Sequence, residues 1–131
     1  MLTVGAGTGI TAKFAEQGGA DLIAIYNSGR YRMSGFGFCA GLLAYGNANA
    51  IVMEMGEREM LPVVKEVPVI AGVNGTNPPR RMRNFLKQVK DVVFDGVNNF
   101  HLTLEETGLG FCKEIEMIDI IRNMDLFTIS L

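Results

Sequence analysis

The chain has 131 residues, of which 48% are apolar and 20% charged, and its formal net charge is −2. The apolar fraction is too high for a disordered chain, and the balance of charges lacks the excess of Lys and Arg that nucleic-acid binding needs. The length suits one domain with a buried core but falls short of the roughly 200 residues of a complete (β/α)8 barrel. We therefore expect one folded domain that binds no nucleic acid.

The lack of a targeting signal and the small number of cysteines predict a cytoplasmic protein. No apolar run approaches the roughly 18 residues needed to cross a bilayer, and the first residues lack the pattern of a signal peptide. Cys39, Cys112 and His101 are the only cysteines and histidine, too few for a structural zinc site, which needs about four such ligands. We therefore expect no membrane association, no zinc, and reduced thiols.

The first half of the chain alternates between strand and helix patterns. The predicted elements are a strand at residues 2–4, a helix at 10–17, a strand at 21–26, an irregular glycine-rich segment at 27–46 and a helix at 50–65. The near-continuous apolar run at 21–26 is typical of a parallel strand that is covered on both faces. Gly18 and Gly19 end the first helix in the way that glycines commonly do.

The second half continues the alternation. The predicted elements are a strand at 67–73, a helix at 80–90, a strand at 95–100, a helix at 109–123 and a strand at 125–131. An order of βαβαβαβαβ indicates a parallel sheet with right-handed crossovers. Two architectures fit this order: an open five-stranded doubly wound sheet, and about five-eighths of a (β/α)8 barrel.

Ligands bind at the carboxyl ends of the strands in both architectures, which gives a short set of candidate residues. The candidates for binding a substrate are Gly7, Thr8, Asn27, Ser28, Gly29, Arg30, Asn74, Thr76 and Asn98. The candidates for catalysis are His101, as a general base or metal ligand, and Glu105 and Glu106, as a general acid or a metal carboxylate. The alternatives are a structural histidine and two acids that start a helix.

The loop after the first strand resembles a dinucleotide-binding fingerprint but departs from it. The pattern GxGxxG requires a third glycine where Ile10 stands, and the acid that would bind a ribose after the second strand is absent. We therefore expect no NAD. The glycines favour either the approach of an anionic group to the start of a helix or a tight turn.

The loop after the second strand combines four kinds of polar group. Residues 27–30 offer an amide, a hydroxyl, a bare backbone N–H and a guanidinium. These groups suit a clamp for a carboxylate or a phosphate, in which Arg30 makes two parallel hydrogen bonds. The alternative is an exposed loop with solvated arginines.

Four long runs, at residues 4–30, 41–55, 71–78 and 104–110, closely resemble the phosphoenolpyruvate hydrolase-like TIM-barrel family, also described as TIM-barrel signal-transduction enzymes. The resemblance implies a barrel related to the phosphoenolpyruvate mutase and isocitrate lyase group. Residues 1–131 would then form a single partial barrel domain with strands one to five. Because the edges of strands one and five would be open, we expect self-association or pairing with a missing barrel segment.

The resemblance also implies a chemistry. Enzymes of that group act on small 2-oxo or enol acids such as phosphoenolpyruvate and phosphonopyruvate, typically with Mg²⁺. Ser28 and Gly29 would bind the carboxylate of this small anionic substrate, and Glu105 or Glu106 would assist a metal or a proton transfer. The expected activity is that of a hydrolase or a lyase.

The sequence departs from the family at two places inside the chain. Asn77 stands where we expect an Asp, and an amide lacks the negative charge of a metal ligand or a general base. The loop after the fourth strand is about ten residues shorter than we expect. A non-catalytic module that binds a ligand or a protein, and a fragment that is inactive alone, therefore stand as alternatives to an enzyme.

Overall fold

A computed structural model describes residues 1–43, 45–76, 81–99, 108–124 and 126–130. The strands are β1 (Thr3–Ala6), β2 (Leu22–Ile25), β3 (Val69–Val73), β4 (Gly96–Asn99) and β5 (Phe127–Ser130). The helices are α1 (Gly9–Gln17), α2 (Asn27–Met33), α3 (Ala48–Met55), α4 (Met82–Asp91) and α5 (Gly108–Arg122), with a 3-10 segment η1 (Phe38–Leu42) and a π-helical segment η2 (Gly56–Met60). None of the helices in these ranges is long and apolar enough to span a membrane.

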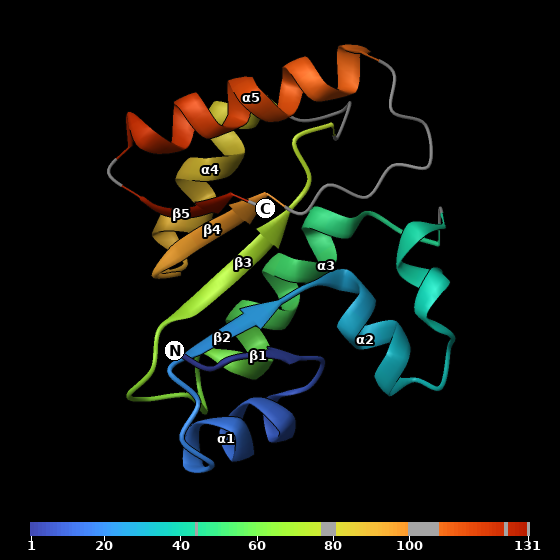
Figure 1. Ribbon diagram of the computed structural model, residues 1–131, viewed down its shortest axis with the longest axis vertical. Helices are drawn as coiled ribbons and strands as arrows, with labels where there is room; N and C mark the ends of the chain where they lie inside the picture. Colours follow the sequence, from blue (N-terminus) through green and yellow to red (C-terminus); the bar gives the residue numbers. More distant parts are fainter. Residues whose placement is uncertain (44, 77–80, 100–107, 125, 131) are drawn as a thin grey trace.

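The five strands form one parallel sheet in the order β1-β2-β3-β4-β5. Figure 1 shows them in this order, with α1 beside β1 at one end and α5 beside β5 at the other. A doubly wound sheet changes the direction of its strand order, whereas strands paired in chain order with right-handed crossovers place their helices on one face. The strand order therefore excludes the doubly wound alternative and matches part of a (β/α)8 barrel.

One face of the sheet packs against the helices and forms the hydrophobic core. The strands contribute alternate apolar residues, among them Ile23, Val69, Ala71 and Val97. The helices contribute Ala12, Val52, Met55, Phe85, Leu86, Val89, Met117 and Ile121, all of them fully or almost fully buried. The alternation follows from the two-residue period of a strand, which sends successive side chains to opposite faces.

The opposite face of the sheet, which would be the inside of a barrel, lines a cavity of about 220 Å³. Thr3, Leu22, Ala24, Ile70 and Asn98 come from four neighbouring strands and line it together with Met1 and Tyr26. The lining is mostly apolar, with polar groups at its carboxyl end. The two faces of the sheet thus differ: one packs against the helices to form the core, and the other borders a pocket that is partly open.

The segment at 27–46, which the sequence predicts to be irregular, contains α2 and η1, so that prediction was wrong in part. Glycine and serine are weak helix formers, so helix propensity alone does not predict α2 in this segment. The structure shows what offsets the weak propensity: a Cβ on Gly29 would lie 2.9 Å from the Ala6 carbonyl oxygen and from the Cα of Gly7. Only glycine allows this approach, so tertiary packing fixes the first turn of α2.

The helix predicted at 50–65 also differs from the structure. The α-helical part, α3, ends at Met55 and continues as η2, where the N–H of Leu61 donates to the carbonyl oxygen of Gly56, five residues back. The Phe94 ring lies directly on Gly56 and leaves no room for a Cβ there. The close packing of this ring accompanies the change from an α-helical to a wider turn.

Carboxylates bind the backbone at the amino ends of the strands. Asp21 Oδ2 accepts a hydrogen bond from the N–H of Leu2 at 2.6 Å, and Asp95 Oδ2 accepts one from the N–H of Val69 at 2.7 Å. Glu16 Oε1 accepts three, from the N–H groups of residues 65–67, at 2.7 to 3.2 Å. We call Glu16, Asp21 and Asp95 the amino-end carboxylates; they join the starts of β1 and β3 to neighbouring segments.

The contact between Gly7 and Gly29 gives a first prediction. A methyl group on Gly7 would overlap the carbonyl group of Gly29, so Gly7→Ala should lower the free energy of unfolding by about 1–3 kcal/mol. The matched control is Gly5→Ala, two residues earlier, where an added Cβ meets nothing within 4 Å. Urea unfolding of both variants measures the difference. Equal effects at the two positions would contradict the close packing described above.

The amino-end carboxylate Glu16 gives a second prediction. Hydrogen bonds from the N–H groups of Glu66 and Lys65 lower the pKa of Glu16 below its ordinary value of 4.5. A lowered pKa contributes stability above pH 4.5 that is lost as the pH falls through the folded-state pKa. Glu16→Gln keeps an acceptor oxygen but removes the charge, so its unfolding free energy should fall less steeply in that acidic window.

Urea unfolding between neutral and acidic pH measures this slope. Glu57→Gln is the control, because Glu57 is exposed and makes no ion pair within the described residues. If the unfolding free energies of Glu16→Gln and Glu57→Gln fell equally steeply at acidic pH, the lowered pKa of Glu16 would be contradicted.

Candidate functional site

The first turn of α2 lies between two other backbone segments at the carboxyl end of β2. On one side Gly29 contacts Gly7, in the loop that follows β1. On the other side Ser28 contacts Gly41 of η1, where an added Cβ would lie 2.5 Å from the Cβ of Ser28. Three glycines therefore make room for this turn, and main-chain contacts fix the position of Ser28.

Two of the predicted clamp residues use their polar groups inside the protein. Asn27 is buried and its Nδ2 donates to the carbonyl oxygen of Gly41 at 3.3 Å, while the N–H of Gly29 donates to the carbonyl oxygen of Tyr26 at 3.0 Å. Ser28 is half-buried, and its hydroxyl has no hydrogen-bond partner among the described residues. The hydroxyl of Ser28 is therefore available to a ligand at the end of β2.

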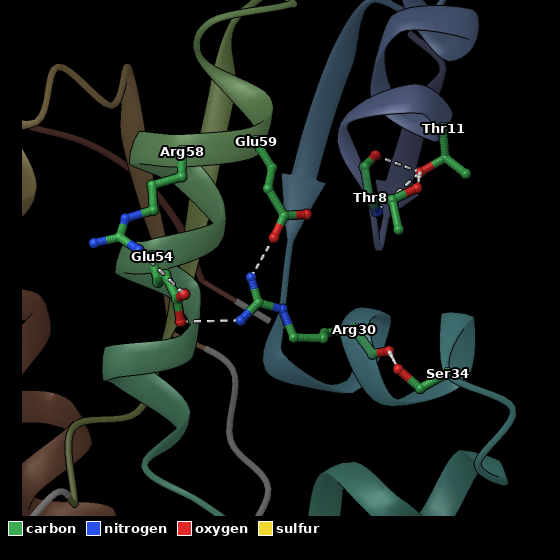
Figure 2. A network of polar contacts seen from close by, with 7 residues as sticks. All are labelled: Thr8, Thr11, Arg30, Ser34, Glu54, Arg58 and Glu59. Atoms are coloured by element: carbon green, nitrogen blue, oxygen red, sulfur yellow. Dashed lines mark hydrogen bonds and ion pairs between the residues drawn. The ribbon is translucent and has the colours of Figure 1, made fainter.

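The guanidinium of Arg30 is held by two carboxylates in the helix layer. Its Nη1 donates to Glu54 Oε2 at 3.0 Å, and its Nη2 pairs with Glu59 Oε1. Figure 2 shows the guanidinium between the two acids, with Arg58 on the far side of Glu54. The side chain is about a quarter exposed, so each pair is worth about 1 kcal/mol or less. The role of Arg30 in an anion clamp stays a prediction.

The start of α1 is capped by its own residues. The hydroxyl of Thr11 accepts from the N–H of Thr8 at 3.1 Å and donates to the carbonyl oxygen of Thr8 at 2.7 Å. These contacts are drawn in Figure 2. The Thr8 amide is thus engaged within the helix, and Gly7 serves close packing. The part of either residue in substrate binding stays a prediction.

A buried asparagine, Asn49, holds the loop after β3. Its Oδ1 accepts from the N–H of Asn74 at 2.8 Å, and its Nδ2 donates to the carbonyl oxygen of Asn74 at 2.9 Å. The Asn74 Oδ1 in turn accepts from the N–H and the hydroxyl of Thr76. The structure therefore brings together two predicted binding residues, Asn74 and Thr76, and fixes them through Asn49.

Two asparagines, Asn47 and Asn49, lie at the start of α3, and the cap is Asn47. Its Oδ1 accepts from the N–H of Ala50 at 3.0 Å. The sequence contains one indication that Asn49 has a different role. Only one of two asparagines two residues apart can cap the same helix, so the other needs a different partner. Its partner, Asn74, is 25 residues away in the chain and could not be identified from the pattern.

Tyr26 and Asn98 form a polar pair at the carboxyl end of the pocket on the helix-free face of the sheet. The Tyr26 hydroxyl donates to Asn98 Oδ1 at 3.2 Å, and its ring lies over Gly72. Burial raises the pKa of Tyr26 above its ordinary value of 10.0, so the phenol stays protonated and remains a donor at neutral pH. Asn98, a predicted binding residue, thus lines this pocket rather than the α2 turn.

The three predicted catalytic residues, His101, Glu105 and Glu106, lie outside the described residues, as does Asn77. Their roles stay predictions. Within the described ranges, no three His, Cys, Asp or Glu side chains lie close enough to hold a metal ion. The polar side chains at the carboxyl ends of β1 to β4 are instead amides and hydroxyls, which fit the Mg²⁺ of the expected chemistry poorly.

The contacts of Asn49 give a third prediction. Asn49→Ala leaves the half-buried N–H and carbonyl of Asn74 without these partners, so it should lower the free energy of unfolding by about 1–3 kcal/mol. Asn47→Ala, the matched control, removes one exposed cap and should cost about 1 kcal/mol. Urea unfolding measures both, and amide exchange at Asn74 reports the local effect. A smaller loss at Asn49 than at Asn47 would contradict the network.

Comparison with known proteins places the fold in an established group. The structure is similar to that of 2,3-dimethylmalate lyase, a member of the PEP mutase/isocitrate lyase superfamily, with a TM-score of 0.72. The likeness covers 99% of this chain and 46% of the other, at 14% sequence identity. An identity this low shows the fold alone, and the fold is that of a TIM-barrel superfamily.

Two tomato proteins are similar in sequence. The ToMV resistance protein Tm-1(GCR237) and the ToMV susceptible protein tm-1(GCR26) of Solanum lycopersicum are each 55% identical to this chain over 138 positions. Each alignment covers 98% of this chain but 18% of the tomato protein. The chain therefore spans less than one fifth of the length of these relatives.

The family assignment rests on the whole length of the sequence. The model of the phosphoenolpyruvate hydrolase-like family matches residues 1–131, and the resemblance in the sequence and the superfamily of the structural neighbours agree with it. The chain belongs to the phosphoenolpyruvate hydrolase-like family.

Proposed function

We propose that this domain binds a small anionic 2-oxo or enol acid, of the phosphoenolpyruvate and phosphonopyruvate class, at the carboxyl ends of its strands. The acid would lie at the end of β2 and accept a hydrogen bond from the Ser28 hydroxyl. In barrels of this kind the ligand site is formed by the loops that follow the strands. Membership of the phosphoenolpyruvate hydrolase-like family supports the choice of this substrate class.

The single observation that carries the proposal is the state of the Ser28 hydroxyl. It is half-buried and has no hydrogen-bond partner among the described residues, while main-chain contacts with Gly41 fix the residue that bears it. A donor that is already positioned gains more from a ligand than one that must first be ordered. A hydrogen bond to a carboxylate is also stronger than one between neutral groups.

The start of α4 adds positive charge at the same end of the sheet. Arg81 and Arg83 lie at and just after its cap, and the first turn has no acidic residue. The N-terminus of a helix also carries a partial positive charge. This arrangement favours an anionic ligand over a neutral or cationic one.

We propose further that the domain converts the acid in a hydrolase or lyase reaction. His101, Glu105 and Glu106 follow β4 in the chain and are the proposed groups for proton transfer. Phosphorus NMR of phosphoenolpyruvate and phosphonopyruvate incubated with the chain tests for turnover. Loss of turnover in Glu105→Gln or Glu106→Gln, with binding retained, would support the assignment.

Binding itself gives the fourth prediction. Ser28→Ala removes the donor, so it should weaken the binding of phosphonopyruvate ten- to a hundredfold, equivalent to about 1.5–3 kcal/mol for a hydrogen bond to a charged group. Isothermal titration calorimetry measures the affinity. The conservative variant Ser28→Thr should restore part of it.

Ser34→Ala is the matched control for Ser28→Ala. Ser34 caps the far end of the same helix, and its hydroxyl donates to the carbonyl oxygen of Arg30 at 3.0 Å. This variant should bind phosphonopyruvate as the unmodified chain does. Equal affinities for Ser28→Ala and Ser34→Ala, or an equal loss in both, would overturn the role of Ser28.

A second candidate function is that of a non-catalytic module that binds a ligand or a protein. The pairing of Arg30 with Glu54 and Glu59 favours it, because it neutralises the cation that lies on the same helix as Ser28. The names of the tomato relatives also refer to ToMV resistance and susceptibility rather than to a reaction. Binding of phosphonopyruvate without turnover would favour this module over the enzyme.

A further inference from the structure

Among the described residues, the carboxyl ends of β1 to β4 carry neutral polar groups and no carboxylate. The side chains there are hydroxyls and amides, those of Thr8, Asn27, Ser28, Asn74, Thr76, Asn98 and Asn99. Between Asp21 and Glu54 the sequence contains no Asp or Glu at all. Mg²⁺ is a hard cation that is usually bound through one or two carboxylates, so this set of donors fits it poorly.

Three amide oxygens at or beside these strand ends are already used as acceptors, whereas Asn99 Oδ1 is buried without a hydrogen-bond partner in the described structure. Asn74 Oδ1 accepts two hydrogen bonds from Thr76, Asn49 Oδ1 accepts one from the backbone of Asn74, and Asn98 Oδ1 accepts one from Tyr26. A cation would have to displace these donors before it could bind the same oxygens. The hydrogen bonds at these three oxygens therefore oppose metal binding, and the amides also lack the negative charge that usually binds Mg²⁺.

The described acids nearest to the strands are engaged elsewhere. The amino-end carboxylates bind backbone N–H groups at the opposite edge of the sheet. Glu54 and Glu59 pair with Arg30 in the helix layer. None of these five carboxylates is therefore positioned to contribute to a metal site at the carboxyl ends.

We propose that the acid is held at the ends of β1 to β4 by neutral donors and without a divalent cation. This inference rests on the proposed function, because it concerns the same site and the same class of ligand. The Ser28 hydroxyl binds the carboxylate, and the charge of the acid is balanced by the basic start of α4 rather than by a metal. The site differs in this respect from the Mg²⁺ chemistry expected of the superfamily.

Calorimetry with the full chain tests the proposal. Phosphonopyruvate is titrated once in EDTA and once in excess Mg²⁺, with the heat of Mg²⁺ binding to the acid itself subtracted, and Mg²⁺ is titrated alone. The affinity for the acid should agree within about twofold between the two buffers. Mg²⁺ alone should give no saturable binding. Ser28→Ala should weaken binding by the same factor in both buffers, which locates the measured binding at the described site.

The outcomes separate the inference from the proposed function. Ser28-dependent binding that requires Mg²⁺, or saturable binding of Mg²⁺ alone, would overturn the inference and leave the proposed function standing; a metal held by Glu105 and Glu106 would appear in this way. No binding in either buffer would overturn both. Binding that Ser28→Ala leaves unchanged would also overturn both, because the acid would then lie elsewhere.

Discussion

The close approach of two backbones, at Gly7 and Gly29, is the constraint on which the rest of the site depends. It fixes the start of α2 against the loop after β1, and Gly41 fixes the same turn from the other side. Side chains can change rotamer at little cost, but a packed main chain cannot shift without moving the elements that it joins. The site is therefore positioned by main-chain packing, and the glycines of the strand-end loops serve that packing first.

Polar groups are divided between the two ends of the sheet. Carboxylates join the starts of the strands to the backbone, through Asp21, Asp95 and Glu16. Amides do the corresponding work at the carboxyl ends, where Asn27 holds η1 and Asn49 holds the loop after β3. In barrels the amino end of the sheet serves stability and the carboxyl end serves the ligand, and here the chemistry of the side chains follows the same division.

Much of the fold could be predicted from the sequence, because buried parallel strands read as apolar runs and crossover helices as periodic ones. The order of the strands could not, since a βα alternation fits two topologies; the resemblance to a family favoured the one that the structure shows. Ser28 became a candidate because strand ends mark ligand sites, and its role in binding stays a prediction. The pairing of Arg30 with acids 24 and 29 residues further on was missed, because only tertiary structure brings them together.

The division of charge has a consequence for how the protein responds to acidity. Glu16, whose pKa is lowered by hydrogen bonds from backbone N–H groups, lies at the amino end, where its ionisation affects stability. At the carboxyl end the described amides and hydroxyls are uncharged, and burial raises the pKa of Tyr26 above its ordinary value of 10.0. Across the range from about pH 5 to 9 the recognition groups described here keep one protonation state. The affinity for the ligand would then vary with pH through the ionisation of the ligand, whereas the stability of the fold would vary with the ionisation of the protein.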